Sequence, residues 1–372
     1  MDIDAKQFLH TLFSSAVNEA LPKNHIEPFL PKDIFYRSAN QGGRTVVIGA
    51  GKAAAMAAEL ESVWQNNKSA DLAVGDLEGL VVTRYEHTAP CEYIEVIEAA
   101  HPVPDAMGLE VGQRILDLVT GLNEDDTVIC LLSGGGSALL SLPGGEITLQ
   151  EKQAINKALL KSGAAIDEMN CVRKHLSAIK GGRLAKAAYP ATILSLAISD
   201  VPGDDISVIA SGPTVPDSTT RFDALAILER YNIEIPTSAF QWLNSPESET
   251  VKPEDDCWKN STHHIIATPQ SALESAAAES EGLGIPAYIL SDCIEGEARD
   301  VAKVHAALAK QIADKAQPFE TPCVLLSGGE TTVTVKGNGR GGRNCEFLLS
   351  LYNELKGHDR IYALAADTDG ID

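Results

Sequence analysis

A glycine-rich turn in the first part of the chain carries a lysine that could bind an anion. The string GAGKAAA begins at Gly49, and Lys52 lies inside it. Glycine allows a backbone to approach a ligand closely, and the start of a following helix presents free N–H groups. Gly49, Gly51 and Ala54 also fit the GxGxxA pattern of dinucleotide sites, but no acidic residue follows the next expected strand at Thr83. The turn therefore favours a phosphate or carboxylate ligand, and an ordinary tight turn with a solvated lysine is the alternative.

A second glycine string follows an expected buried strand at residues 127–132. It reads SGGGSALLS from Ser133 to Ser141, with three consecutive glycines before Ser137. Because glycine is entropically expensive to order, a purely structural turn rarely needs three in a row, and the string favours an anion-binding nest. The GxSxG pattern of nucleophilic serines is absent, so we do not expect Ser137 to attack a substrate.

Five basic residues lie close together between positions 170 and 185. They are Arg173, Lys174, His175, Lys180 and Arg183. In an acidic protein, such a stretch could form the local positive site that an anionic substrate needs. The alternative is a solvated helix face, which is the usual role of a charged run.

Acidic residues follow another expected buried strand, at residues 192–198. Asp200 and Asp204 lie in the string SDVPGDD, at the strand end where open α/β sheets bind ligands. Mg²⁺ prefers one or two carboxylates together with substrate phosphates, so both residues are candidate ligands. The string SGPT at Ser211–Thr214 is a further candidate phosphate loop. The alternative for both acids is that they cap turns.

The last candidate site lies near the C-terminus. The string GNGRGGRNCEF surrounds Arg340 and Arg343 with glycines just before an expected helix, and forked guanidinium groups suit a polyphosphate. Glu330, Asp367 and Asp369 could add a base or a metal ligand. The alternative for this loop is a flexible hairpin connection.

The elements that must position these strings alternate between apolar β-branched runs and helical patterns, which predicts an α/β fold with parallel sheets. The expected strands of the first part are 45–48, 79–83, 93–98, 127–132 and 192–198. A polar stretch without periodicity, 244–261, is predicted to be a linker. The second part has expected strands at 264–267, 287–290, 323–327, 331–336 and 361–366.

Composition narrows the class of protein. The 372 residues predict about two domains, and 44% apolar residues are enough for a sizeable core. The net charge of −22 and an aromatic content of 5% argue against binding to nucleic acid or anionic lipid. No apolar run is long enough to span a membrane, and the N-terminus lacks the basic start of a signal peptide. Seven cysteines without a CxxC pair are typical of reduced thiols, so we expect a cytoplasmic protein.

Taken in series, the strings resemble the MOFRL-type glycerate 2-kinase family, whose members are sometimes named hydroxypyruvate reductases. The matching strings are GAGKAA, HPVPD (101–105), SGGGSALL, RKHLSAIKGGRLA, SDVPGD with SGPT, IEGEARDVA (294–302), SGGETTVTV, GRGGRN and DTDGID, in the family's order. The resemblance covers nearly the whole chain from about Val46. It implies ATP-dependent phosphorylation of D-glycerate to 2-phosphoglycerate with Mg²⁺, in a cleft between two α/β domains.

The resemblance also sets the expected domain boundaries. A Rossmann-like N-terminal domain with a mainly parallel sheet is expected over 1–243, a linker over 244–261, and a smaller α/β domain with a mixed sheet over 262–372. Family members continue well past DTDGID, whereas this chain stops at Asp372 in a loop that has just begun. We therefore expect the second domain to be incomplete and the natural protein to continue.

The strings and the resemblance together assign residues to roles. The expected catalytic residues are Lys52, Asp200, Arg343 and Asp367. The expected substrate or nucleotide ligands are Gly49, Gly51, Ser133, Gly134, Gly135, Gly136, Ser137, Arg173, Lys180, Ser211, Gly212, Glu330, Gly341, Gly342 and Asn344. The expected Mg²⁺ ligands are Asp200, Asp204 and Asp369. The expected partners are D-glycerate and ATP, without nucleic acid or membrane, and a homodimer is one option for the oligomeric state.

Two other classes of function stay open at this point. An NAD(P)-dependent hydroxypyruvate reductase is supported by the GxGxxA pattern alone, and the missing acid after Thr83 argues against it. A non-catalytic anion sensor would need the glycine nests but not three separate acidic sites. Turnover of ATP with glycerate, or of NADH with hydroxypyruvate, distinguishes the three classes.

Overall fold

The computed structural model describes residues 4–23, 25–35, 42–69, 74–201, 203–337, 339–368 and 370. The chain packs into two units, each with its own internal contacts. The larger unit is Pro22–Ile266, and the smaller unit combines Met1–Leu21 with Ala267–Asp372. The two units are described separately below.

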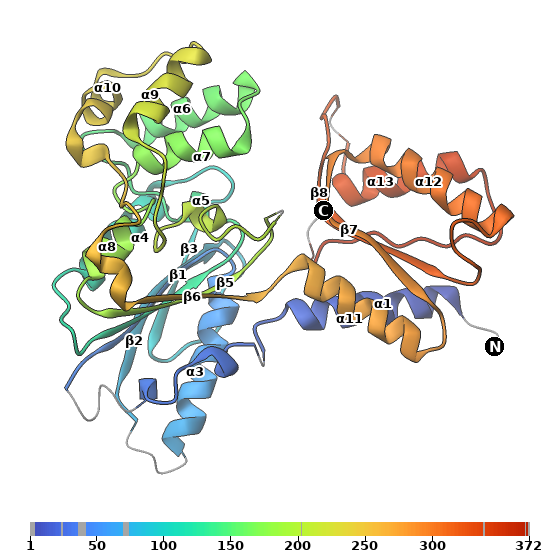
Figure 1. The fold of residues 1–372 in the computed structure, drawn as a ribbon, viewed down its shortest axis with the longest axis horizontal. Coiled ribbons are helices and arrows are strands. Elements are labelled where there is room, and N and C mark those ends of the chain that lie inside the picture. The colour runs from blue at the N-terminus through green and yellow to red at the C-terminus, as the bar shows by residue number, and fades with distance from the viewer. Residues whose placement is uncertain are drawn as a thin grey trace. The chain divides into compact units, whose positions relative to one another are not determined.

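The larger unit is built on a six-stranded sheet (Figure 1). Its strands are β1 (Thr45–Ala50), β2 (Leu77–Arg84), β3 (Ile94–Ala99), β4 (Thr127–Leu132), β5 (Thr192–Ile198) and β6 (Ser261–Ala267). The strand order is β3-β2-β1-β4-β5-β6, and the first five strands are parallel to one another. This is the order of the doubly wound Rossmann fold, in which the direction of winding reverses between β1 and β4. The prediction of a Rossmann-like first domain is therefore confirmed.

Strands β1 and β4 are buried along their whole length because helices cover both faces of the sheet. Successive side chains of a strand point to opposite faces, so Val46 and Ile48 join one core while Val47 joins the other. Helices α4 (Ala106–Val119) and α8 (Arg183–Ala188) pack on the first face, and α3 (Ala53–Ser69) packs on the second. Figure 1 shows this three-layer arrangement.

Four helices form a separate cluster with an apolar core of their own (Figure 1). They are α6 (Leu149–Ser162), α7 (Ile166–His175), α9 (Arg221–Arg230) and α10 (Thr237–Asn244). Ile155, Leu159 and Val172 contribute to this core. The remaining elements of the larger unit are α5 (Gly136–Leu139) and the 3-10 turns η1 (Glu27–Phe29), η2 (Ile209–Ser211), η3 (Pro246–Ser248) and η4 (Asp256–Asn260).

The predicted linker at 244–261 is wrong, because this segment belongs to the larger unit. Ser248, Val251 and Cys257 are buried, and the Val251 amide donates a hydrogen bond to the Gly181 carbonyl at 3.0 Å. The segment is polar in sequence, but its backbone is held by hydrogen bonds to the rest of the unit. The next expected strand, 264–267, is the edge strand β6 of the large sheet rather than the start of a second domain.

The smaller unit contains two strands and four helices among its described residues. They are β7 (Ala287–Glu297), β8 (Val324–Thr332), α1 (Ala5–Ala20), α11 (Pro269–Gly282), α12 (Ala298–Lys315) and α13 (Arg343–Leu355). The N-terminal helix α1 joins this unit, with Ser15 Oγ lying 2.9 Å from Ser275 Oγ of α11. The unit boundaries therefore differ from the predicted boundaries at 243 and 262, because helix α1 packs with the second part of the chain.

The predicted mixed sheet of the smaller unit is wrong, because β7 and β8 pair in parallel. Helix α12 connects them, and parallel neighbours need such a crossover. The two strands expected at 323–327 and 331–336 are the single strand β8, while residues 361–366 form no strand. None of the helices in the described ranges is long and apolar enough to cross a membrane.

Candidate functional site

The glycine loops that follow β1 and β4 lie against each other at the point where the sheet reverses its winding. A Cβ atom on Gly49 would lie 2.6 Å from the Leu131 carbonyl oxygen. Gly51 has a φ of +111°, and a Cβ there would lie 2.5 Å from the Ser133 carbonyl oxygen. The Lys52 amide donates a hydrogen bond to Ser133 Oγ at 2.6 Å, and the Lys52 side chain is exposed. Both glycines are therefore required by the close approach of the neighbouring strand and loop.

Each glycine of the loop after β4 is pressed by a different segment. A Cβ on Gly134 would lie 1.6 Å from Asp200 Oδ2, so the Asp200 carboxylate occupies the space that a side chain would need. A Cβ on Gly135, whose φ is +82°, would lie 3.2 Å from the His101 ring, and Gly136 packs as closely on Ala210. Because these glycines lack side chains, Asp200, His101 and the loop around Ala210 can all pack against the loop at the end of β4.

Ser137 connects this loop to the SGPT string. Ser137 Oγ lies 2.7 Å from Ser211 Oγ, and Lys180 Nζ donates to the Ser137 carbonyl at 2.8 Å and to the Ala210 carbonyl at 3.2 Å. Ala210, Ser211 and Gly212 all have left-handed backbone conformations, with φ between 52° and 61°. Ser211 is fully buried, and its carbonyl accepts from the Gly181 amide. The segment is held in a strained conformation by its surroundings, as functional loops often are.

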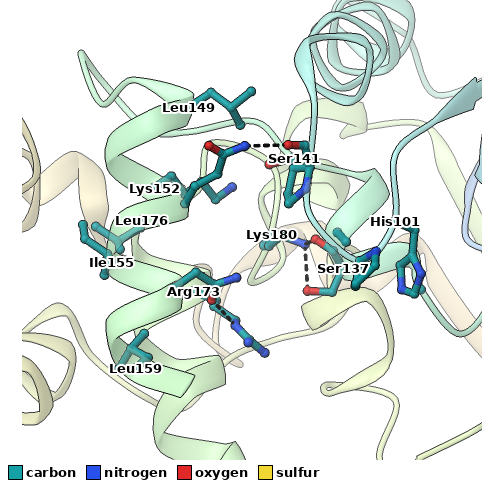
Figure 2. Close-up of a pocket in the computed structure, with 16 residues that line it drawn as sticks. His101, Ser137, Ser141, Leu149, Lys152, Ile155, Leu159, Arg173, Leu176 and Lys180 are labelled. Atoms are coloured by element: carbon teal, nitrogen blue, oxygen red, sulfur yellow. Dashed lines mark hydrogen bonds between the residues drawn. The ribbon is translucent and has the colours of Figure 1, made fainter. Parts of the chain in front are cut away.

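A pocket of about 260 Å³ opens beside this loop, within the larger unit (Figure 2). Helices α6 and α7 contribute Lys152, Ile155 and Arg173 to one side, and Ser137 and His101 lie on the other. Pockets of this kind, with apolar walls and a few polar groups, are the usual place for a small ligand.

Burial shifts the pKa values of the three cationic side chains that line the pocket. Burial, together with the charge of Arg173, lowers the pKa of Lys152 to about 7. Burial also lowers the pKa of Arg173 below its usual value, and burial with repulsion from Lys152 and Arg173 holds the pKa of Lys180 well below its usual range. Removal of the charged form from water is the main cause in each case.

The other three basic residues of the 170–185 stretch have structural partners instead. Lys174 forms a buried ion pair with Asp217 at 3.2 Å. His175 is fully buried, and its Nδ1 lies 2.8 Å from the Cys171 carbonyl oxygen. Arg183 donates to the backbone carbonyls of the 247–249 segment. The idea of one basic site formed by all five residues is therefore wrong, because only Arg173 and Lys180 line the pocket.

The candidate magnesium ligands differ in their surroundings. Asp200 lies against Gly134, as described above. Asp204 has a φ of 54°, and its Oδ1 is buried without a hydrogen-bond partner among the described residues. Asp369 lies outside the described residues, which contain no cluster of three or more histidine, cysteine or acidic side chains that could hold a metal alone. A cation held by Asp200 or Asp204 fits the preference of Mg²⁺ for few carboxylates together with substrate phosphates.

In the smaller unit, Arg343 at the start of α13 lies between two carboxylates. Its NH2 lies 3.0 Å from Asp367 Oδ1, its Nε lies 3.1 Å from Asp367 Oδ2, and its NH1 also contacts Glu330. Asn344 Nδ2 donates to Asp367 Oδ2 at 3.2 Å. The preceding Gly341 has a φ of +109°, and Gly342 caps the helix. The five predicted residues Glu330, Gly342, Arg343, Asn344 and Asp367 thus lie at one place.

Comparisons with known proteins place the chain in a family. A domain of unknown function (DUF4147) matches residues 8–244, and the MOFRL family matches residues 323–372. D-glycerate 2-kinase from Thermotoga maritima is 40% identical over 360 residues, which are 96% of this chain and 79% of that protein. The chain belongs to the MOFRL-type glycerate 2-kinase family.

The glycerate 2-kinase family also accounts for the fold and for the second name in the sequence analysis. A crystal structure of glycerate kinase from Thermotoga maritima covers 95% of this chain, and 80% of that chain is covered, with a TM-score of 0.79 and 38% identity. A putative hydroxypyruvate reductase from Agrobacterium vitis is 49% identical over 378 residues, covering 100% of this chain and 81% of that protein. Both names given to the family therefore occur among these relatives.

In this glycerate 2-kinase family member, the sequence analysis gave no role to two titratable residues of the pocket, Lys152 and His101. Lys152 lies on the same face of α6 as Ile155 and Leu159, so a lysine in the apolar stripe of an amphipathic helix was the available signal. His101 begins the HPVPD string, which was noted without a role. Its contact with Gly135 could not be seen in the sequence, because the two segments are brought together only by the fold.

Proposed function

We propose that this protein transfers the γ-phosphoryl group of ATP to the 2-hydroxyl of D-glycerate and so forms 2-phosphoglycerate. The observation that carries the proposal is the group of loops and side chains at the switch point of the sheet, where the winding reverses between β1 and β4. Two glycine loops, Asp200 and a pocket with three cations meet at the ends of β1 and β4. Parallel α/β sheets bind ligands at this position, and relatives of the chain are named D-glycerate 2-kinase and glycerate kinase.

Phosphoryl transfer depends on positioning and on stabilisation of charge more than on covalent chemistry. We assign Lys52 to the developing charge on the transferred group, because its side chain is exposed next to the paired glycine loops. Asp200 would orient the attacking hydroxyl of glycerate or bind the metal. Arg343 and Asp367 are proposed to act on the same reaction from the smaller unit, as the resemblance implies.

Mg²⁺ fits the residues of the larger unit. Asp200 and Asp204 would hold it together with phosphate oxygens of ATP, since the buried Oδ1 of Asp204 lacks a partner among the described residues. Bound there, Mg²⁺ would neutralise phosphate charge. The cytoplasmic location, the absence of nucleic acid as a partner and the homodimer stay predictions.

Product analysis tests the proposed function. The protein is incubated with ATP, Mg²⁺ and D-glycerate, and ³¹P NMR distinguishes phosphorylation at the 2-hydroxyl from phosphorylation at the 3-hydroxyl. We expect 2-phosphoglycerate and ADP in equal amounts. Formation of 3-phosphoglycerate alone, or no consumption of ATP, contradicts the proposal.

Hydroxypyruvate reduction is the second candidate, because a relative at 49% identity carries that name. The geometry of the GxGxxA turn does not favour it. Gly49 and Gly51 are accounted for by contacts with Leu131 and Ser133, and the Lys52 amide already bonds Ser133 Oγ. A dinucleotide site needs these glycines to admit a pyrophosphate. An absorbance assay that monitors the oxidation of NADH or NADPH in the presence of hydroxypyruvate decides between the two activities.

A further inference from the structure

The pocket between helix α6, helix α7 and the loop after β4 is lined by basic side chains, and its lining contains no acidic residue. Of its 16 lining residues, all of them described, Lys152, Arg173 and Lys180 are cationic and none is acidic. His101 is the remaining titratable group of the lining. Figure 2 shows Lys152 and Arg173 on the helical side and His101 on the opposite side. In a protein of net charge −22, this local excess of positive charge is notable because acids are abundant elsewhere.

Within the described residues, the side chains of Arg173 and Lys180 donate hydrogen bonds to neutral groups only, and Lys152 has no partner. Lys152 Nζ is buried and has no partner among the described residues. Arg173 Nε donates to Asn156 Oδ1 at 2.7 Å. Lys180 Nζ donates to the Ser137 carbonyl at 2.8 Å and to one further carbonyl. Elsewhere in the unit a buried lysine is paired with a carboxylate, so the pocket is an exception.

Burial of an ammonium group without a counter-ion is strongly unfavourable. Here three basic side chains share one pocket, and repulsion from Arg173 adds to burial in lowering the pKa of Lys152. An anion in the pocket would remove this penalty and supply the missing partner for Lys152 Nζ. The unfavourable arrangement is therefore best accounted for by a ligand that carries negative charge.

We propose that Lys152, Arg173 and Lys180 bind the charged group of a small organic acid in this pocket. The charged group is a carboxylate or a phosphoryl group, which guanidinium and ammonium groups both recognise. Only the identity of the acid rests on the proposed function, which names D-glycerate as substrate and 2-phosphoglycerate as product.

The size and the walls of the pocket favour a small acid over a nucleotide. Its volume of about 260 Å³ is below the roughly 300–1,000 Å³ of typical sites for drug-sized ligands. Ile155, Leu159 and Leu176 give the pocket apolar walls against which a short carbon skeleton can pack. Gly135 and Ser137 line it as well, so an acid held here would lie next to the strand end where we place the reaction.

Proton uptake gives a second signature of the same binding event. With a pKa of about 7, much of Lys152 is neutral at about pH 8 in the free protein. A bound anion raises this pKa, so binding takes up a proton at that pH. The affinity for the acid should therefore fall by up to about tenfold per pH unit above pH 7. His101, Arg173 and Lys180 face Lys152 in the pocket.

The experiment is titration calorimetry with D-glycerate, 2-phosphoglycerate, inorganic phosphate and ATP, each added alone. The proteins are the wild type, Lys152→Met and the control Lys157→Met, which changes an exposed lysine of the same helix. Runs at about pH 8 in two buffers with different heats of ionisation measure proton uptake. We expect Lys152→Met to weaken binding of glycerate or 2-phosphoglycerate by about tenfold or more and to reduce the proton uptake, with Lys180 supplying the rest. Lys157→Met should bind as the wild type does.

Four results would overturn the proposal. The acids bind Lys152→Met as tightly as the wild type, or they bind the wild type without proton uptake, or only ATP loses affinity. Loss of affinity for inorganic phosphate with unchanged affinity for both acids also contradicts it. Calorimetry measures binding and not turnover, so a failure of the proposed kinase activity can be told apart from a failure of this proposal. If only the kinase activity fails, acid binding still depends on Lys152 while no phosphorylated product forms.

Discussion

In the smaller unit Arg343 lies between Asp367 and Glu330, whereas in the larger unit three cations line one pocket that holds no carboxylate. The first arrangement is complete without a ligand, because both sides of the guanidinium fork meet acidic oxygens. The second arrangement is incomplete, because the buried Lys152 Nζ has no partner among the described residues. The comparison indicates that Arg343 is positioned by the protein itself, whereas we propose that the pocket receives its counter-charge from a bound anion.

The largest expected effect comes from Arg343→Lys. The change keeps the charge but loses the planar fork that bonds both oxygens of Asp367, so the side chain can no longer be held in place. We expect kcat/KM for glycerate phosphorylation to fall by about 10²–10³-fold if Arg343 acts on the substrate. Arg360→Lys is the matched control, since Arg360 forms an ion pair with Asp314 at the surface. A near wild-type rate for Arg343→Lys would mean that the cluster around Arg343 is structural.

The next effect concerns Lys52, the exposed lysine beside the paired glycine loops. We expect Lys52→Ala to lower kcat/KM by about 10²-fold, because the loss of one transition-state cation typically costs about 3 kcal/mol. The fold should survive, because the side chain is exposed and its amide keeps the hydrogen bond to Ser133. Lys68→Ala, at the exposed end of α3, is the control. If both variants have the wild-type rate, Lys52 is a solvated turn residue.

The sequence predicted the positions that depend on local pattern. The strands predicted at 127–132 and 192–198 are β4 and β5, because long β-branched runs buried on both faces are a strong local signal. The residues of the glycine loops were also recognised. Their role in close packing was not, because it depends on contacts such as that between Gly134 and Asp200, which are far apart in the chain.

Two failures of the sequence analysis share one physical cause, which is that polar character does not determine exposure. The segment 244–261 is polar, but hydrogen bonds of Arg183 and Gly181 anchor its backbone inside the larger unit. Lys152 is likewise polar and yet its amino group is buried. Partners in distant segments decide both cases, and a single sequence does not reveal those partners.

A smaller effect, on stability, tests whether Lys152 lacks a counter-charge in the free protein while Arg343 has one. The unfolded chain holds the proton of Lys152 up to about pH 10.5, whereas the native protein loses it above about pH 7. The unfolded state thus binds more protons at this site in this window, so the contribution of Lys152 to stability rises with pH from about 7 to about 10.5. Lys152→Met removes this cost of burying a charge and should be more stable than the wild type by about 4 kcal/mol at about pH 7, with the difference vanishing toward pH 10.5.

Urea unfolding at about pH 7 and about pH 10 measures this difference. Arg343→Met is the comparison, because it removes a half-buried cation that has two acidic partners. We expect it to lower stability by about 1 kcal/mol or less at either pH, so the two cation-to-methionine changes have opposite signs. A Lys152→Met protein that is less stable than the wild type at about pH 7 would show that Lys152 has a counter-charge in the free protein.

The smallest effect on activity is expected from Gly134→Ala, which probes how the switch point is packed. A Cβ at this position would lie 1.6 Å from Asp200 Oδ2, so the carboxylate must move. We expect kcat/KM to fall by about tenfold, because a carboxylate that must move by roughly an ångström or more makes weaker transition-state contacts. Gly282→Ala is the control, since nothing lies within 4 Å of a Cβ there.

A double-mutant cycle shows whether Gly134→Ala lowers kcat/KM by displacing Asp200 or by disturbing the loop in general. Asp200→Gly removes the carboxylate, and Gly134→Ala is then added to it. If the new methyl group acts by moving Asp200, it has little further effect once Asp200 is absent, and the two changes are far from additive. If the losses simply multiply, Gly134 is needed for another reason, such as the approach of a ligand to its backbone, and the loop after β4 would itself contact the substrate.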